Sequence, residues 1–199
     1  MRLLIGTSNQ GKVIEYRALL GGLDIVLVSP DELEPVPTEP AEDHDTYREN
    51  AIAKAEAYAA ATGLPTVADD SGLEVDALGG APGVRSRRYF GDDASAEVRN
   101  DKLLALLEEA PQRTARFVCV AALAYPGGPT ETFEGIVRGE IAMAPRHGDD
   151  GSGFGYDPVF IIVGDGRTMA ELSPEDKNAV SHRGLAVAKL RARLAAEPR

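Results

Sequence analysis

The chain has 199 residues, of which 43% are hydrophobic and 27% are charged, with 21 glycines and 13 prolines. These proportions are typical of one globular domain, and they exclude a disordered or collagen-like chain. The 32 acidic residues outnumber the 21 basic ones, and the resulting net charge of −11 repels polyanions. We therefore expect no nucleic-acid partner, whereas a small phosphorylated ligand can bind where basic side chains gather locally.

The sole cysteine, Cys119, lies in the apolar run at residues 117–121. A single thiol excludes disulfides and cysteine-based metal sites, and it favours a reducing, cytoplasmic setting. The apolar residues 1–5 are too few for a signal peptide, and no stretch approaches the roughly 18 apolar residues of a membrane span. We expect a cytoplasmic protein that does not contact a membrane.

Strand and helix patterns alternate in the first half of the chain. Residues 2–6 predict a buried strand, and after a polar turn residues 12–20 have helical spacing. Thr46 and Glu49 have the spacing of a capping box. The other elements predicted here are a strand at 24–28, an exposed proline-rich loop at 29–45, a helix over 51–61 that ends at Gly63, a strand at 65–68 and irregular structure at 69–91.

The second half combines a predicted hairpin with helices. Two runs at 114–125 and 130–144 flank a Pro-Gly-Gly-Pro turn, and the first alternates with a period of two, which predicts a long β-hairpin. The other predicted elements are a helix from Ser95 to Ala110, a glycine-rich loop at 148–155, a strand at 159–163, a helix start at Ser173 and a helix over 179–196. This order predicts a single α/β domain over residues 1–199, with a mixed central β-sheet flanked by helices.

A polar turn joins the first predicted strand to the first helix. Backbone N–H groups at such a helix start, together with the helix dipole and a nearby lysine, favour a phosphate group. The alternative is an ordinary capped helix start, and the spacing is not that of a Walker A loop. The candidate phosphate-binding residues are Thr7, Ser8, Asn9, Gln10, Gly11 and Lys12.

Lys54 falls on the face of its predicted helix that carries Tyr47, Ala51 and Tyr58. This is the face that the helix should bury, and a lysine that points inward needs an anion. The alternative is a side chain whose aliphatic part is buried while its ammonium reaches water.

Two adjacent carboxylates, Asp69 and Asp70, follow the strand predicted at 65–68. If strand geometry continues, they point to opposite sides, and Ser71 shares the side of Asp69. Adjacent acids at a strand end suit a Mg²⁺ site, whereas a solvated turn is the alternative. The acidic loop offers further ligands at Glu39, Glu42, Asp43 and Asp45, although such a loop can also be simply solvated.

Near the C-terminus, the segment 151–158 places aromatic residues between glycines. Backbone can approach a ligand there while Phe154 or Tyr156 presents a ring to a base, although a flexible linker is the alternative. His182 and Arg183 begin the last helix pattern, and such a pair is normally a surface feature. The histidines lack zinc-ligand spacing, and Cys119 is too deep in a strand to be a ready nucleophile.

Together these segments resemble the inosine/xanthosine triphosphate pyrophosphatase family over nearly the whole chain. The motifs that carry the resemblance are Thr7-Ser8-Asn9 with Lys12 and Glu15, Thr46 with Glu49-Asn50-Ala51 and Lys54-Ala55, Asp69-Asp70-Ser71-Gly72-Leu73 with Gly79-Gly80-Ala81-Pro82-Gly83, Phe154-Gly155-Tyr156-Asp157-Pro158, and Ser181-His182-Arg183-Gly184. The resemblance implies two lobes around a nucleotide cleft, a homodimer, and hydrolysis of aberrant purine nucleoside triphosphates to monophosphate and pyrophosphate.

The resemblance also implies roles for the charged residues. Mg²⁺ would be held by Glu42 and Asp70, and Asp70 or Asp69 would take a proton from the attacking water. Lys54, with Lys12, would offset the charge of the triphosphate. Substrate contacts are further implied at Ser71, Phe154, Gly155, Tyr156, Asp157, Lys177, His182 and Arg183, with Phe154 stacked on the purine.

Two other functions compete with this interpretation. A Maf-like nucleotide pyrophosphatase would carry a Ser-x-Ser-Pro-Arg pattern near the N-terminus, which this chain lacks. A regulatory module could bind a nucleotide without hydrolysing it. Paired acids beside Lys54 argue against that module, because plain triphosphate binding needs no carboxylates unless a metal is recruited.

Overall fold

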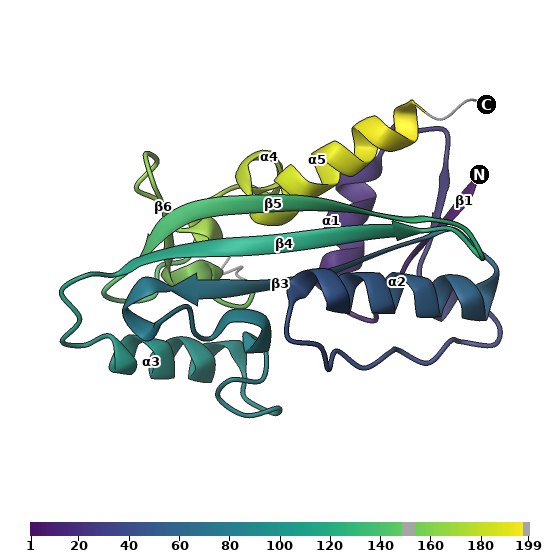
Figure 1. The fold of residues 1–199 in the computed structure, drawn as a ribbon. Coiled ribbons are helices and arrows are strands. Elements are labelled where there is room, and N and C mark those ends of the chain that lie inside the picture. Colours follow the sequence, from purple (N-terminus) through teal and green to yellow (C-terminus); the bar gives the residue numbers. More distant parts are fainter. Residues whose placement is uncertain (149–153, 197–199) are drawn as a thin grey trace. The chain divides into compact units, whose positions relative to one another are not determined.

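The structure is a computed structural model that describes residues 1–148 and 154–196. Its strands pair in the order β2-β1-β3-β4-β5-β6 (Figure 1). The first strand pairs in parallel with β2 and β3, whereas β5 and β6 are antiparallel, so the predicted α/β class with a mixed sheet is confirmed. The strands are β1 (Arg2–Ile5), β2 (Val26–Val28), β3 (Thr66–Val75), β4 (Thr114–Ala124), β5 (Thr130–Ile141) and β6 (Phe160–Ile162). The α-helices are α1 (Gln10–Leu20), α2 (Tyr47–Thr62), α3 (Ala96–Leu106), α4 (Pro174–Val180) and α5 (His182–Ala195).

The chain divides into two compact units. Unit 1 comprises Met1–Asp70, Cys119–Gly135 and Arg183–Arg199, and unit 2 comprises Ser71–Val118 and Ile136–His182. Strands β3, β4 and β5 contribute residues to both units. The single domain and the nucleotide cleft that the sequence analysis expects stay predictions.

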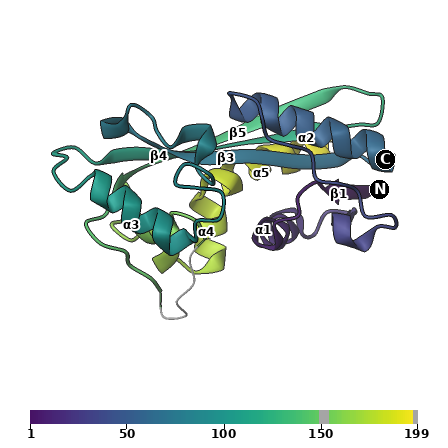
Figure 2. The same cartoon turned by 90° about the horizontal axis from the view of Figure 1, so that it is seen from below.

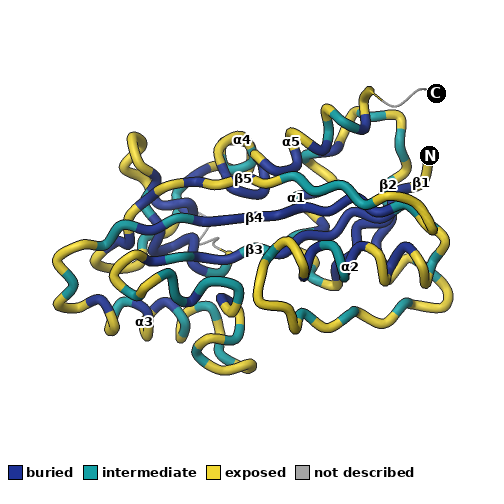
Figure 3. The backbone as a smooth tube through the Cα atoms, viewed as in Figure 1, coloured by how far each residue is buried: buried dark blue, intermediate teal, exposed yellow. Residues whose placement is uncertain are grey.

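Strand alternation builds the core of unit 1 in two layers. Val67 packs in a cluster with residues of α1 and α5, whereas the next residue, Ala68, packs with the alanines of α2. Successive strand side chains point to opposite faces, so helices must cover both. Figures 1 and 2 show α2 on one side of these strands and α5 on the other, and β4 is buried along nearly its whole length in Figure 3.

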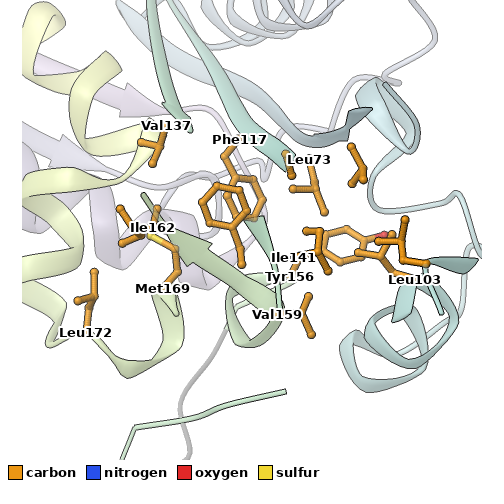
Figure 4. Packing of buried hydrophobic residues seen from close by; sticks show 14 residues of the cluster. Leu73, Leu103, Phe117, Val137, Ile141, Tyr156, Val159, Ile162, Met169 and Leu172 are labelled. Carbon is orange, nitrogen blue, oxygen red and sulfur yellow. The ribbon is translucent and has the colours of Figure 1, made fainter. Parts of the chain in front are cut away.

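Unit 2 has a core of aromatic and aliphatic side chains. Phe117 of β4 packs against Phe160 of β6 with ring centroids 4.5 Å apart. Leu103 of α3, Tyr156 and Met169 belong to the same cluster (Figure 4). This core joins α3 and the segments around β6 to the strand residues of unit 2.

One predicted boundary is wrong, because residues 69–75 continue β3 instead of forming an irregular segment. The sequence Asp-Asp-Ser-Gly is typical of a turn, but six of the seven residues from Val67 to Leu73 are buried inside a sheet, where tertiary pairing outweighs local preference. Irregular structure begins after Val75, with short 3₁₀ turns at Asp76–Leu78 and Gly83–Arg85.

The helix ends match the signals in the sequence closely. Thr46 caps α2 by accepting the backbone N–H of Glu49, and Gly63 ends it in the left-handed conformation at φ 68°. The predicted helix from Ser95 is confirmed but ends at Leu106, before Ala110. The helix predicted over 179–196 begins instead at His182, because Ser181 ends α4.

Candidate active site

The two adjacent acids of β3, Asp69 and Asp70, lie in different surroundings within unit 1. Asp69 follows the side of Val67 and contacts Lys12 of α1 and Arg183 of α5. Asp70 follows the side of Ala68 and contacts Asn50 of α2. The prediction that strand geometry separates the two carboxylates is therefore confirmed, because β3 continues through both residues.

Asp69 is fully buried and neutralised by basic side chains. Its Oδ2 lies 3.1 Å from Lys12 Nζ and 3.1 Å from Arg183 Nη2, and Lys12 Nζ also donates to the Asp69 carbonyl oxygen at 3.3 Å. Arg183 Nη1 is paired with Glu15 at 2.5 Å. Burial alone would raise the pKa of Asp69, but Lys12 and Arg183 hold it well below its usual range. Asp69 is therefore a fixed anion.

Asp70 is also buried, but its surroundings disfavour its charge. Its Oδ2 accepts a hydrogen bond of 2.9 Å from Asn50 Nδ2. Burial and the carboxylate of Glu42 raise the pKa of Asp70 to about 6, and the Asn50 hydrogen bond opposes them only in part. A carboxyl group with a pKa in this range can exchange a proton near neutral pH.

Lys54 is an inward-pointing amine, as its helical face predicts. Its side chain is 1% exposed and forms an ion pair with Glu42. Burial lowers the pKa of Lys54, but Glu42 and Asp69 outweigh that effect and the net shift is upward. Burial likewise opposes the charge of Glu42, but Lys54 lowers its pKa overall. The Lys54 ammonium therefore stays charged beside the carboxylates of Glu42 and Asp69.

The polar turn before α1 is both a helix cap and a part of this cluster. Asn9 accepts the backbone N–H of Lys12 at 3.2 Å, so the capped helix start is real. The hydroxyl of Ser8 donates to Glu39, which brings the acidic loop to the turn. Thr7 is buried, whereas Gln10 and Gly11 are exposed at the start of α1.

Glu42 and Asp70 are the carboxylates suited to a divalent cation. Among residues 1–148 and 154–196, no group of three or more His, Cys, Asp and Glu side chains could hold a metal ion. Mg²⁺ needs fewer protein ligands, because it is usually bound through one or two carboxylates while waters and substrate phosphates supply the rest. The upward shift of the Asp70 pKa by Glu42 is a repulsion that a bound divalent cation would relieve. The donor set therefore fits Mg²⁺.

Unit 2 holds a second group of predicted site residues. Lys177 Nζ lies 2.8 Å from Asp157 Oδ2, and the same oxygen accepts the backbone N–H of Phe154 at 3.2 Å. The Phe154 side chain is exposed, which suits a stacking surface. Gly155 has φ 61°, a backbone conformation that L side chains rarely adopt.

Ser71, which follows Asp70 in β3, is half-buried. Residues 149–153 of the predicted glycine-rich loop lie outside the described residues.

Three predicted substrate residues are buried and contact other side chains or backbone groups of the protein. Tyr156 is buried in the core of unit 2, and its hydroxyl donates to the carbonyl of Ser86 at 2.9 Å, which leaves Phe154 as the stacking candidate. His182 stacks on Phe117 with ring centroids 4.6 Å apart. Arg183 is buried in unit 1, where its guanidinium pairs with the carboxylates of Asp69 and Glu15, and its expected contact to the purine stays a prediction.

Two residues of this cluster have no role predicted from the sequence. Asn50 and Glu15 each contact a predicted site residue, namely Asp70 and Arg183. For Asn50 a signal existed, because it lies four positions before Lys54 on the same helical face and is a poor helix former within an alanine-rich run. For Glu15 no local signal could name a partner 168 positions away.

Comparisons with known proteins agree with one another. The model of the Ham1 family matches residues 3–193. A dITP/XTP pyrophosphatase of Geobacter sulfurreducens is 51% identical over 96% of this chain and 94% of that protein, and one of Symbiobacterium thermophilum is 49% identical over 98% and 95%. A solved HAM1 protein from Coxiella burnetii is 41% identical, with a TM-score of 0.89 over 99% of this chain and 100% of that one. None of the helices that the structure describes combines the length and apolarity that a membrane crossing needs.

Proposed function

This chain belongs to the Ham1 family, and from that premise we infer that it is a nucleoside triphosphate pyrophosphatase. It hydrolyses aberrant purine nucleoside triphosphates such as dITP and XTP to the monophosphate and pyrophosphate. The observation that carries this conclusion is the joint presence of two buried acids, Asp69 and Asp70, and two amines, Lys12 and Lys54, in one unit of such a chain. Hydrolysis removes these nucleotides from the pool before a polymerase can incorporate them.

We assign proton transfer to Asp70. Water that attacks the α-phosphorus needs a group to accept its proton, and the most effective base has a pKa near the working pH. Of the two adjacent acids, Asp70 is the better proton acceptor, because Lys12 and Arg183 hold the pKa of Asp69 well below its usual range, whereas the pKa of Asp70 is raised. Lys12 and Lys54 offset the charge of the triphosphate. Because water attacks the α-phosphorus directly and pyrophosphate leaves, no covalent enzyme intermediate is needed.

Glu42 and Asp70 are the residues that would hold Mg²⁺. The support is their donor chemistry and their mutual repulsion in unit 1. When bound, such an ion polarises phosphate oxygens and stabilises the charge that develops on them. Lys54 pairs with Glu42 in the structure, so it also limits how far these acids repel one another before substrate binds.

The residues of unit 2 supply the proposed contacts to the base. Phe154 presents an exposed ring for stacking, and Lys177 and His182 are donors suited to the oxygen at position 6 of hypoxanthine or xanthine. The amino group of adenine would face these donors with another donor and leave buried groups unpaired. Mismatches of this kind can discriminate by about 10⁴. Arg183 pairs with Asp69 and Glu15 in unit 1, and its contact to the purine stays a prediction.

We also propose that the protein is a cytoplasmic homodimer. The buried single thiol, Cys119, supports a reducing compartment. The segment at 79–90 carries three arginines and the exposed Tyr89, a composition that suits a protein contact. Sedimentation of the purified chain tests the dimer, and a monomer at micromolar concentration would contradict it.

The decisive experiment measures pyrophosphate release with saturating Mg²⁺ from dITP, XTP, dATP and dGTP. We expect rapid release from dITP and XTP and slow release from dATP, whose 6-amino group the proposed donors cannot pair. Guanine keeps the oxygen at position 6, so the turnover of dGTP measures the contacts made at position 2. Equal turnover of dATP and dITP would contradict the proposed base recognition. Calorimetric binding of dITP without any pyrophosphate release would instead identify a regulatory nucleotide-binding module.

A further inference from the structure

Asn50 is a buried amide that bridges two segments of unit 1. It lies in the first turns of α2 and is 1% exposed. Its Oδ1 accepts the backbone N–H of His44 at 3.0 Å, and its Nδ2 donates to the His44 carbonyl oxygen at 3.3 Å. The same Nδ2 donates to Asp70 Oδ2 at 2.9 Å. One side chain therefore pairs both polar groups of a loop residue and also one oxygen of a buried acid.

The chemistry of this bridge requires an amide. Asparagine offers one acceptor and two donors on a short stem, and all three are used here. Aspartate has the same shape but cannot donate to His44 or Asp70, and it would add a third carboxylate beside Asp70 and Glu42. Alanine makes none of these bonds, although it is the better helix former. An asparagine at this position therefore serves contacts outside its own helix.

The position of the bridge connects the two acids of the proposed metal site. His44 lies two residues after Glu42 in the acidic loop, and Asp70 belongs to β3. The bond to Asp70 and the paired bonds to His44 converge on a single side chain of α2. Asn50 thus ties this loop to β3, in addition to the ion pair of Glu42 with Lys54 and the bond of Ser8 to Glu39.

We propose that Asn50 is a positioning residue that fixes the loop of Glu42 against Asp70 and so sets the geometry in which the two carboxylates act. This inference rests on the proposed function and deepens it. It differs from a merely structural role, because Thr46 already caps the same helix through its own bond to Glu49. Loss of the Thr46 cap weakens the start of α2 and leaves the three bonds of Asn50 in place.

The test compares the full-length chain with N50A, N50D and the matched control T46A. In the absence of metal and nucleotide, hydrogen–deuterium exchange should lose the protection of the His44 amide in N50A and retain it in T46A. N50D should retain it in part, because Oδ1 still accepts that N–H. Exchange depends on no catalytic step, so it reports on the bridge even if a variant is inactive.

The second arm measures kcat, the KM for dITP and the Mg²⁺ concentration that gives half-maximal activity. Residues that orient metal ligands typically change metal affinity or activity by about 10–100-fold, so we expect kcat to fall and the half-activating Mg²⁺ concentration to rise by that factor in N50A. T46A should stay within about threefold of the wild type, because it lacks that ligand-orienting role.

Two results would overturn the proposal. The first is a His44 amide in N50A that remains as protected as in the wild type. The second is an N50A enzyme that matches T46A in kcat and in its Mg²⁺ requirement. A wild-type protein that releases no pyrophosphate would contradict the proposed function instead, and the exchange measurement would then still decide whether the bridge exists.

Discussion

The two sides of β3 shift the pKa of a carboxyl group in opposite directions. On the side of α1 and α5, Asp69 is neutralised by Lys12 and Arg183, and its pKa is well below the usual range. On the side of α2, Asp70 meets the amide of Asn50 and the field of Glu42, and its pKa is about 6. The two residues are adjacent in sequence and both are nearly inaccessible to solvent.

This difference shows that burial alone does not make a carboxylate reactive. A buried acid with two basic partners is stable as an anion and contributes to the structure. A buried acid whose surroundings raise its pKa is destabilised as an anion, and a proton or a metal ion relieves that cost. Asp70 therefore has the properties of a functional group, and Asp69 has those of a structural ion that also holds Lys12.

The largest expected effect follows from replacing Asp70. D70N keeps the shape of the side chain and removes both a base and a metal ligand, so kcat should fall by about 10²–10⁴. The measurement is pyrophosphate release from dITP at saturating Mg²⁺. The control is D101N, which removes an exposed acid of α3 that has no proposed role and should change kcat little. Near-full turnover by D70N would exclude Asp70 as the base.

A large loss of stability should follow from breaking the ion pairs on the Asp69 side of β3. R183M leaves the carboxylates of Asp69 and Glu15 without their shared buried partner. Removing one member of a buried ion pair typically lowers the free energy of unfolding by about 3–5 kcal/mol. Urea unfolding of the protein without metal or nucleotide measures this value. A decrease below about 1 kcal/mol, the range of exposed pairs, would mean that Lys12 alone compensates Asp69.

The two acids should also differ in how they couple stability to pH. The pKa of Asp70 is raised to about 6 in the folded protein and is about 3.9 in an unfolded chain. Its contribution to stability is therefore fully present below pH 4 and is lost as the pH rises through 6, a change of roughly 3 kcal/mol. Asp69 has the opposite sign, because its lowered pKa favours folding above pH 4 and this contribution is lost only in stronger acid.

Urea unfolding of the metal-free wild type and D70N between pH 4 and pH 7 separates these contributions. The stability of the wild type relative to D70N should decrease across this interval. The same comparison with D69N should change little between pH 5 and pH 7, because Asp69 stays ionised there in both folded and unfolded chains. A wild-type advantage over D70N that is independent of pH would contradict the raised pKa of Asp70.

Local periodicity predicted the parts of this site that depend on one element. The helical face of Lys54 gave its inward direction, and the alternation of β3 gave the separation of Asp69 and Asp70. These predictions needed only the repeat of a helix or a strand. The length of β3 was missed, because Asp-Asp-Ser-Gly has turn chemistry and only pairing within the sheet keeps it extended.

Contacts between distant segments could not be predicted in the same way. Arg183 and Asp69 are 114 positions apart, and nothing near either residue indicates the other. The choice between Phe154 and Tyr156 as the exposed ring likewise depended on the core that forms around Ser86 and Leu103. A role for Asn50 could have been predicted, since its spacing from Lys54 and its poor helix propensity both distinguish it from its neighbours.

The smallest expected effect concerns an exposed ion pair on α5, which tests whether burial explains the larger contribution of the Arg183 pairs to stability. Arg193 lies on α5, as Arg183 does, and pairs with Glu131 at 2.9 Å. The side chains of Arg193 and Glu131 are each about one-third exposed. Exposed pairs contribute about 0–1 kcal/mol, because water screens the charges in both states. R193M should therefore lower the free energy of unfolding by less than about 1 kcal/mol in the assay used for R183M. An equal loss in the two variants would show that α5 depends on its arginines for packing, whatever carboxylate each one meets.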